Sequence, residues 1–296
     1  MYIIIFNKKM KIDNWTLYKN IGKGTNSELF LAKKENDLNN YIAKQYINTD
    51  EDNSDLISLI KNEVMFLEEL SHPNVIKLNG VKKTKTHIFC IFEYCNGGNL
   101  SKILENYQQK YGKPFSLEII QYLMKQMIEA LKYLHQVNII HLNIKLENIL
   151  VNFNDEKDLD ELNMMKSQIK IANFKYAGKV VNLLKLKVAH HIKLEKPKLT
   201  EKDKKTDILH LGEICCQMLL GKYAVNSDIE NMVKIIDEII QGKNNSPIVL
   251  SKEILSFMKN MITNDVRKRA KIYELSEHEF LEKDVKNFQI INQKTL

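Results

Sequence analysis

The pattern of apolar residues changes character once along this chain, and this change constrains the fold more than any other feature of the sequence. Before residue 96, β-forming residues occur in short runs bounded by Gly and Asn, which is typical of strands and turns. After Leu100, apolar residues recur every three or four positions, as they do on the buried face of a helix. We therefore expect an α+β fold in which a small, mainly β part precedes a larger, mainly α part.

The first part is expected to hold five strands and one helix. The strand signals lie at Trp15–Ile21, Glu28–Lys33, Asn40–Ile47, Val75–Val81 and His87–Tyr94. The first three favour an antiparallel meander, and the last two complete a five-stranded sheet. A helix is expected after the acidic stretch at residues 50–55, because acidic side chains stabilise a helix N-terminus.

In the second part, one long helix is expected to present a continuous buried face. That face consists of Leu117, Ile120, Leu123, Met124, Met127, Ile128, Leu131 and Leu134. Further helices are expected near Asp207, Ile229 and Ile254, and short strands at Ile149–Asn152 and Ile169–Ala172. The acidic insert between these two strands lacks the spacing and the glycine of an EF-hand calcium loop, so we interpret it as a solvated turn.

Composition excludes several classes of protein. With 44% hydrophobic and 27% charged residues, but 10 Gly and 4 Pro, the chain suits one continuous globular fold without a flexible linker. No apolar run approaches the ~18 residues of a membrane span, so no membrane association is expected. The four cysteines form no C-x-x-C pair, which favours a reducing compartment and therefore a cytoplasmic or nuclear location.

The net charge of +7 does not indicate a nucleic-acid partner. Nearly all of the basic charge is lysine, because Arg267 and Arg269 are the only arginines. Dispersed lysines usually form a solvated surface, whereas nucleic-acid sites combine arginine clusters with aromatic platforms. We therefore expect no nucleic-acid binding.

A glycine-containing turn lies between the first two strand signals. Gly22 and Gly24 would allow this turn to approach phosphate oxygens through backbone N–H groups. Lys44 ends the third strand, and Glu63 on the following helix is spaced to reach it. Taken singly, each of these residues is also explained as an ordinary surface residue. Whether together they indicate a phosphate-binding site depends on motifs in the second half of the chain.

Two motifs in the second half resemble those of protein kinases. His141–Leu150, with the letters HLNIKLENIL, resembles the catalytic loop H-R-D-L-K-P-E-N-I-L, and Ile171–Lys175 resembles the family's strand and D-F-G. Other segments resemble the kinase hinge, the helix that anchors the catalytic loop, and the two closing elements. These segments are Glu93–Gly98, Asp207–Gly212, Asn264–Arg269 and His278–Leu281.

The resemblance covers residues 15–281 and implies a bilobal protein-kinase-like fold. It implies a small lobe at residues 15–95, with the five-stranded antiparallel sheet and one helix, and a mainly α large lobe at residues 96–281. The remaining residues are an N-terminal extension, 1–14, and a C-terminal tail, 282–296.

The same resemblance implies a nucleotide site that could still hold ATP. In the family, a lysine such as Lys44 contacts the nucleotide phosphates and pairs with a glutamate such as Glu63, and Phe92 stands at the gatekeeper position. The implied cofactor-binding residues are Ile21, Gly22, Gly24, Leu29, Ala43, Lys44, Glu63, Phe92, Glu93, Cys95 and Leu150. The sequence leaves open whether ATP binds.

Two substitutions fall on the chemistry of phosphoryl transfer. Asn143 stands where the family has its catalytic aspartate; an amide cannot act as a base, and general-base assistance is typically worth about 10² to 10⁴ in rate. Asn173 stands where the D-F-G aspartate holds Mg²⁺, and it offers the metal only a neutral oxygen. Lys145 and Asn148, the second metal ligand, are retained. We expect Mg²⁺ binding to be weak or lost.

Further substitutions bear on regulation. Leu142 replaces the arginine that reads an activation-segment phosphate in many kinases. Between Asn173 and Glu195 the chain has no Ser or Thr and a single tyrosine, Tyr176, so phosphorylation switching is not expected there. Lys175 replaces the glycine of D-F-G, which could restrict the backbone.

These observations lead to two hypotheses. The first is a pseudokinase that acts as a partner-binding or allosteric scaffold, with ATP as a structural ligand and phosphoryl transfer lost or very weak. The alternative is an active serine/threonine-type kinase with an impaired mechanism, because positioning and electrostatics carry most of phosphoryl transfer. The apolar and basic stretch Lys179–Val188 could dock a protein partner, whose identity the sequence does not reveal, or fold back onto the large lobe.

Overall fold

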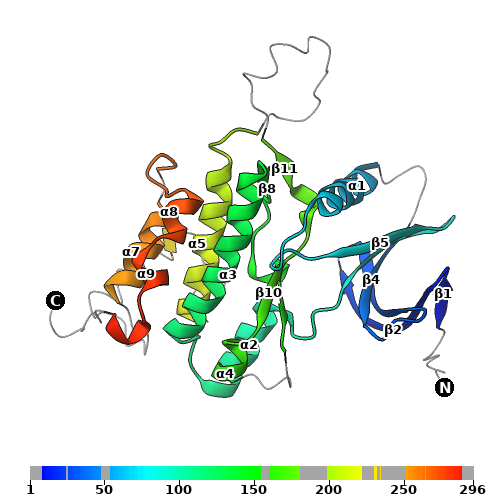
Figure 1. Cartoon of the computed structure of the whole chain (residues 1–296), viewed down its shortest axis with the longest axis horizontal. Coiled ribbons are helices and arrows are strands. Elements are labelled where there is room, and N and C mark those ends of the chain that lie inside the picture. Colours follow the sequence, from blue (N-terminus) through cyan, green and yellow to red (C-terminus); the bar gives the residue numbers. More distant parts are fainter. Residues whose placement is uncertain are drawn as a thin grey trace, which may run out of the picture. The chain divides into compact units, whose positions relative to one another are not determined.

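The computed structural model describes residues 9–24, 26–47, 54–154, 160–180, 199–221, 230–231, 234, 251–263 and 265–288. The chain divides into two compact units (Figure 1), which agrees with the expected bilobal fold. The first unit comprises Met1–Cys95 and Phe174–Tyr176, and the second comprises Asn96–Asn173 and Ala177–Leu296.

The first unit is built on a six-stranded antiparallel sheet with the strand order β1-β2-β3-β4-β6-β5. Its strands are β1 Met10–Ile12, β2 Trp15–Gly24, β3 Ser27–Lys34, β4 Tyr41–Ile47, β5 Leu78–Lys83 and β6 His87–Glu93. The helix α1, Ser54–Glu69, lies between β4 and β5 in the sequence. The five predicted strands and the helix are confirmed. The sheet has one strand more than expected, because β1 lies in the segment that we had treated as an N-terminal extension.

Alternating apolar side chains form the core of this sheet. The buried cluster consists of Trp15, Leu17, Ala32, Ala43, Phe89 and Ile91. Trp15 also packs edge-on against Tyr41, with ring centroids 4.9 Å apart. Such alternation buries one face of each strand and fixes the register, because a slip by one residue would turn every side chain to the other face.

The short segment Phe174–Tyr176, a 3₁₀ turn, packs against α1 within the first unit. The Phe174 ring is fully buried, and the Phe174 N–H donates to Oε1 of Glu63 at 3.2 Å. The side-chain amide of Asn62 donates to the carbonyl of Lys175 at 3.0 Å. These bonds hold the residues after Asn173 against α1.

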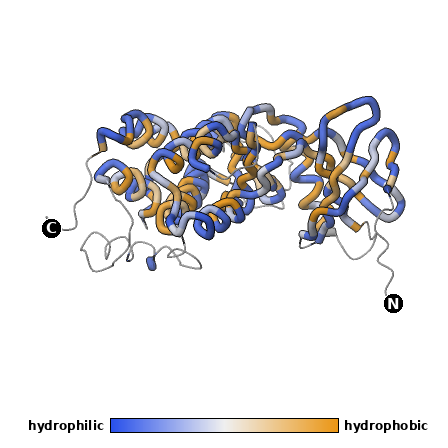
Figure 2. The backbone as a smooth tube through the Cα atoms, turned by 90° about the horizontal axis from the view of Figure 1, so that it is seen from below, coloured by the Kyte–Doolittle hydropathy of each residue, from blue (hydrophilic) through white to orange (hydrophobic). Residues whose placement is uncertain are grey.

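The second unit is mainly helical. Its helices are α2 Leu100–Tyr111, α3 Leu117–Gln136, α4 Glu161–Met164, α5 Lys204–Leu220, α7 Lys252–Met261, α8 Ile272–Ser276 and α9 Glu279–Glu282. All eight residues of the predicted long helical face are buried in α3, and apolar and polar residues mix along the helices (Figure 2). Helices predicted near Asp207 and Ile254 are confirmed as α5 and α7, whereas Ile229 lies outside the described residues.

Short strands complete the second unit. They are β7 Gly98–Asn99, β8 Ile139–Ile140, β9 Ile149–Asn152, β10 Gln168–Ile171 and β11 Gly178–Lys179. The two predicted strands, β9 and β10, pair antiparallel with each other, which brings the end of the catalytic-loop motif beside the start of the D-F-G-like motif. Among the residues that the structure describes, no helix has both the length and the apolarity needed to cross a membrane.

Candidate functional site

The backbone of the His141–Leu150 loop is held by Asp207, a fully buried residue of α5. Its two carboxylate oxygens accept the N–H groups of His141 at 2.9 Å and of Leu142 at 2.8 Å. Its Oδ2 also lies 2.9 Å from Nε2 of His135 on α3. This clamp fixes Leu142 at φ 60°, a left-handed conformation that leucine rarely adopts without such support.

Burial and hydrogen bonding set the charges around this clamp. Burial alone would raise the pKa of the Asp207 carboxyl, but the hydrogen bonds from His135 and the His141 N–H outweigh it and lower that pKa. The His141 ring accepts the Asn143 N–H at Nδ1 and lies 3.1 Å from the Ala172 carbonyl at Nε2. The Asn143 N–H can only donate and the Ala172 carbonyl can only accept, so His141 is the neutral tautomer with its proton on Nε2. Burial accordingly lowers its pKa to about 4, against the opposing charge of Asp207.

Three asparagines of the second unit form a connected chain of amides. The Nδ2 of Asn173 donates to Oδ1 of Asn148 at 3.1 Å, and the Nδ2 of Asn148 donates to the Asn143 carbonyl at 2.7 Å. The Oδ1 of Asn173 is buried without a hydrogen-bond partner. Asn173 has φ 70°, a conformation that asparagine tolerates better than most residues.

This amide chain does not fit a Mg²⁺ ion. Mg²⁺ requires oxygen ligands in near-ideal octahedral geometry and is normally bound by one or two carboxylates together with phosphates. Here the two expected ligands, Asn148 and Asn173, are neutral, and the oxygen of one already accepts the N–H of the other. In the described ranges, no group of three His, Cys, Asp or Glu side chains could hold a metal. The residues present therefore do not replace the missing carboxylate.

The remaining catalytic-loop positions lie in the same unit. Lys145 is exposed, and Asn143 and Leu150 are half-buried. The family's cation is thus present and accessible. Where the family has a catalytic carboxylate, however, the Asn143 side chain can only form neutral hydrogen bonds.

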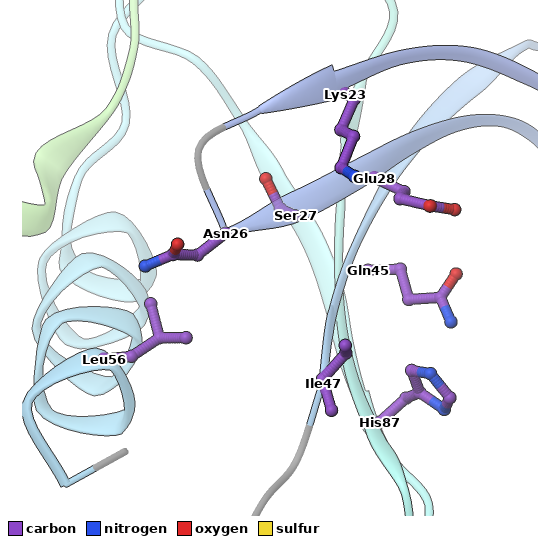
Figure 3. A pocket seen from close by; sticks show the side chains of 8 residues that line it. All are labelled: Lys23, Asn26, Ser27, Glu28, Gln45, Ile47, Leu56 and His87. Carbon is purple, nitrogen blue, oxygen red and sulfur yellow. The ribbon is translucent and has the colours of Figure 1, made fainter. Parts of the chain in front are cut away.

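The glycine turn of the first unit joins β2 to β3, where Gly24 pairs with Ser27. Ser27 is buried, and a Cβ added at Gly24 would lie 2.8 Å from its Oγ, so a side chain at Gly24 would require the Ser27 hydroxyl to move. A cavity of about 400 Å³ adjoins the turn and is lined from β3, β4, α1 and β6 by residues such as Glu28, Gln45 and Leu56 (Figure 3). None of the predicted nucleotide-contact residues lines that cavity.

Lys44 and Glu63 both lie in the first unit, but the expected ion pair between them is not formed. No salt bridge joins these two described residues; the Oε1 of Glu63 accepts the Phe174 N–H, and its Oε2 is buried without a partner. Glu63 is 2% exposed, so this unpaired oxygen is costly. The prediction of a Lys44–Glu63 pair is wrong for this conformation: the Phe174 N–H is the partner of one carboxylate oxygen, and the other oxygen stays unpaired.

Lys175 and Lys44 both lie near the ring of Tyr46, which the sequence did not suggest. Their ammonium nitrogens lie 4.7 Å and 5.6 Å from the centroid of the same ring, Tyr46. Burial, followed by the positive charge of Lys44, lowers the pKa of Lys175 to about 8. Burial, together with the charge of Glu63, raises the pKa of the Cys90 thiol to about 12. We refer to Lys44, Lys175, Glu63 and Tyr46 as the lysine cluster.

The other predicted cofactor-binding residues of the first unit lie on its sheet or next to it. Ala43, Phe92 and Cys95 are buried, whereas Ile21 is 43% exposed. Gly22 and Leu29 face each other across β2 and β3. The carboxylate of Glu93 accepts the Lys77 N–H at 2.7 Å. The structure thus gathers ten of the predicted cofactor positions in the first unit and Leu150 in the second.

Comparisons with known proteins identify relatives of the chain. The family model of the protein kinase domain matches residues 15–281. MAP kinase kinase kinase mkh1 of Schizosaccharomyces pombe is 27% identical over 94% of this chain and 25% of its own length. Serine/threonine-protein kinase CLA4 of Eremothecium gossypii is 27% identical over 79% of this chain and 29% of its own length. An Aurora kinase of Dictyostelium discoideum is 24% identical over 93% of this chain and 68% of its own length.

This chain therefore corresponds to about a quarter of each of the first two relatives. The match to the family model covers most of the chain, including the loop, the amide chain and the lysine cluster described above.

Proposed function

Because the chain belongs to the protein kinase family, we propose that it is a pseudokinase that binds ATP without a catalytic metal and acts as a partner-binding or allosteric scaffold. The observation that carries the proposal is that neutral asparagines, Asn143 and Asn173, stand at the two carboxylate positions of the family's reaction centre, and that the Asn173 amide is already bonded to the retained Asn148. In the family, one of these carboxylates orients the substrate hydroxyl and the other holds Mg²⁺.

Loss of the carboxylates affects transfer more than binding. Without a base, the rate is expected to fall by about 10² to 10⁴. Without a held metal, the charge that develops on the transferred phosphoryl group is left without its main stabilisation. Binding of a nucleotide depends instead on the glycine turn, on Lys44 and on apolar contacts, all of which this chain retains.

The lysine cluster supports metal-free nucleotide binding. With Lys44, Lys175 and Glu63 ionised, it carries two positive charges and one negative charge. The excess positive charge is partly buried, and a polyphosphate would compensate it with charge-assisted hydrogen bonds. The Oε2 of Glu63 has no partner. One of the two lysines could therefore pair with this carboxylate while the other lysine binds phosphate. Lys175 would thereby supply part of the charge that Mg²⁺ supplies in active kinases.

Titration calorimetry with ATP tests this proposal, once with Mg²⁺ and once with EDTA. We expect the Kd in EDTA to lie within about threefold of the Kd in Mg²⁺. Lys175→Gly, which restores the family residue, should weaken binding in EDTA by about tenfold or more, as expected for the loss of a charge-assisted contact. Lys175→Arg, which keeps the charge, is the matched control. Binding that requires Mg²⁺ would contradict metal-free binding.

The second candidate function is an active serine/threonine kinase. It is favoured by the retained Lys145 and Asn148 and by the names of relatives such as CLA4. A phosphotransfer assay separates the two candidates. Robust transfer by the wild-type protein, abolished by Lys44→Ala, would establish the active kinase, whereas recovery only in Asn143→Asp with Asn173→Asp would support the pseudokinase.

The scaffold role requires a protein partner. We propose a cytoplasmic or nuclear partner and no nucleic acid or membrane. Of the stretch first considered for docking, residues 181–188 lie outside the described part of the chain. If charge reversal at Lys179, Lys185 and Lys187 left every copurifying protein in place, electrostatic docking through that stretch would be excluded.

A further inference from the structure

A cavity of about 430 Å³ is lined by residues of the second unit alone. It contains none of the predicted catalytic, metal or cofactor positions, although His135, whose ring contacts Asp207, is one of its lining residues. Its walls come from the C-terminal end of α3, the residues just before and within the start of α5, and the start of α8. Four of the lining residues are lysines and one is an acid. They are Lys132, Lys204, Lys205, Lys271 and Glu201. We refer to this cavity as the basic pocket.

Two of the four lysines are neutralised by neighbouring groups. The Nζ of Lys204 lies 3.0 Å from the Glu201 carboxylate and donates to the His135 carbonyl and to Oδ1 of Asn138. The Nζ of Lys132 lies 3.7 Å from the carboxylate of Glu129. These two lysines are held in place by the protein itself.

The other two lysines have no carboxylate partner among the residues that the structure describes. The Nζ of Lys205 donates to the carbonyl of Arg269, and the nearby carboxylate of Glu274, which accepts the Lys271 N–H, compensates its charge only in part. Lys271 is exposed, and its Nζ lies 5.6 Å from the centroid of the Tyr273 ring. Burial and the positive charges of Lys271 and Arg269 outweigh the attraction of Glu274 and lower the pKa of Lys205. The basic pocket therefore holds an excess of positive charge at close range.

The position of the pocket adds to this excess. Lys204 and Lys205 are the first two residues of α5, a 17-residue helix, and a helix N-terminus carries a partial positive charge. Cations at this end are unfavourable unless an anion is nearby. The floor of the pocket includes the buried apolar side chains of Ile208 and Ile272, which suit the apolar part of a peptide.

We propose that the basic pocket binds a phosphate monoester, carried as a phosphorylated side chain by a partner protein. A phosphate group is the chemistry that best matches this set of donors, because it brings close to two negative charges and three acceptor oxygens. The volume lies within the range of ligand pockets and exceeds what a bare anion needs, which favours an anion attached to a chain. The pocket requires no nucleotide, so this inference goes beyond the proposed function.

Fluorescence anisotropy at low ionic strength provides the test, because screening weakens such contacts. The probes are labelled seven-residue Gly/Ala peptides with a central phosphoserine or phosphotyrosine, and the same peptides without phosphate. We expect at least one phosphopeptide to bind at least tenfold more tightly than its unphosphorylated form. Equal binding of the paired peptides would overturn the proposal.

Charge reversals locate the site. Lys271→Glu should weaken phosphopeptide binding about tenfold or more. Lys132→Glu should have the same effect and replaces Lys271→Glu in the test if that variant fails to fold. The matched control is Lys166→Glu, an exposed lysine of the same unit outside the pocket, which should change the Kd by less than twofold. Equal effects of the pocket and control variants would overturn the assignment to this pocket.

Competition distinguishes the source of the phosphate. Inorganic phosphate should displace the phosphopeptide only at concentrations at least tenfold above the Kd of the peptide. Displacement by inorganic phosphate at a concentration equal to the Kd of the peptide would mean that the pocket recognises free phosphate. That result would overturn the proposal that the phosphate is carried by a partner protein.

Discussion

Asparagine differs from aspartate in that its side chain carries a hydrogen-bond donor, and the second unit uses that donor. The amide of Asn173 donates to Asn148, which in turn donates to the backbone of Asn143. A carboxylate at residue 173 could not make the first of these bonds. The substitution at residue 173 therefore adds a bond to a polar network that also includes the retained Asn148 and the backbone of Asn143.

This network leads to a prediction for Asn173→Asp. In EDTA, the variant should lower the free energy of unfolding by about 1–3 kcal/mol, because a partly buried carboxylate then faces Oδ1 of Asn148 without a donor. Added Mg²⁺ should restore part of that loss by binding the new carboxylate. Urea unfolding in the two buffers measures both effects. Asn154→Asp, at an exposed asparagine, is the control and should change stability by less than the Asn173 variant.

Lys175 leads to a prediction about pH. Its pKa of about 8 means that it is charged below pH 8 and loses its proton above it. ATP affinity in EDTA should therefore fall as the pH rises from 7 to 9. Lys175→Arg remains charged throughout this range and should bind ATP with a weaker pH dependence. Titration calorimetry at pH 7, 8 and 9 measures the difference, and a wild-type Kd that is constant with pH would contradict the role given to Lys175.

The candidate site was only partly predictable from the sequence. The motif match singled out Lys44, Glu63 and Asn173, and the structure places the first two in the first unit and Asn173 in the second. The contacts were not predictable: the Phe174 N–H, and not Lys44, bonds the Glu63 carboxylate, and Lys175 lies near Tyr46. Those contacts depend on how residues 174–176 pack against α1, and a local pattern does not encode such packing.

Among the elements, long periodic segments were predictable and short ones were not. The periodicity of α3 identified its buried face because twenty residues repeat the pattern several times. The strand β1 has three residues, too few for a period to appear. Val75 and Ile76 are buried but precede β5, which starts at Leu78, so burial alone did not mark the start of the strand.

The contact between α5 and the end of α7 leads to a prediction for Gly212. A Cβ at Gly212 would lie 2.6 Å from Cγ2 of Ile262 and 2.8 Å from Cβ of Met261. Gly212→Ala should therefore destabilise the protein by about 1–3 kcal/mol through overpacking, although alanine favours a helix by about 1 kcal/mol. Urea unfolding measures the net change in the free energy of unfolding from these two opposing effects. Gly80→Ala is the control, because nothing lies within 4 Å of a Cβ at that position, and an equal effect of both variants would contradict close packing at Gly212.

Across the whole molecule, the chain passes from the second unit to the first after Asn173 and returns after Tyr176. Asn173, at the family's metal-binding position, and Lys175, a member of the lysine cluster, are thus two residues apart in the sequence but belong to different units. Within the second unit the Asn173 side chain donates to Asn148, and within the first unit the Phe174 N–H donates to Glu63.

The stability of the protein should depend on pH through His141. Its pKa is about 4 in the folded protein and about 6.5 in an unfolded chain, so the unfolded state binds more protons between these values. The free energy of unfolding should fall as the pH drops from 6.5 toward 4, by up to about 1.4 kcal/mol per pH unit for one proton. The lowered pKa of Asp207 acts in the same direction at still lower pH.

Urea unfolding at pH 7, 6 and 5 measures this slope. His141→Gln removes the titrating ring and should reduce the slope, although its stability at pH 7 will also be lower because the ring bonds both Asn143 and Ala172. A variant with the same slope as the wild type would show that other groups cause the dependence.

The bond between Asn173 and Asn148 also has an evolutionary consequence. An asparagine codon lies a single base change from an aspartate codon, so mutation alone could return the family's carboxylate at residue 173 in one step. If this change came first, the intermediate would lose the amide bond before the second carboxylate, at residue 143, had been regained, and we expect it to be less stable. Under the proposed function, selection for stability would therefore act against a reversion that begins at residue 173.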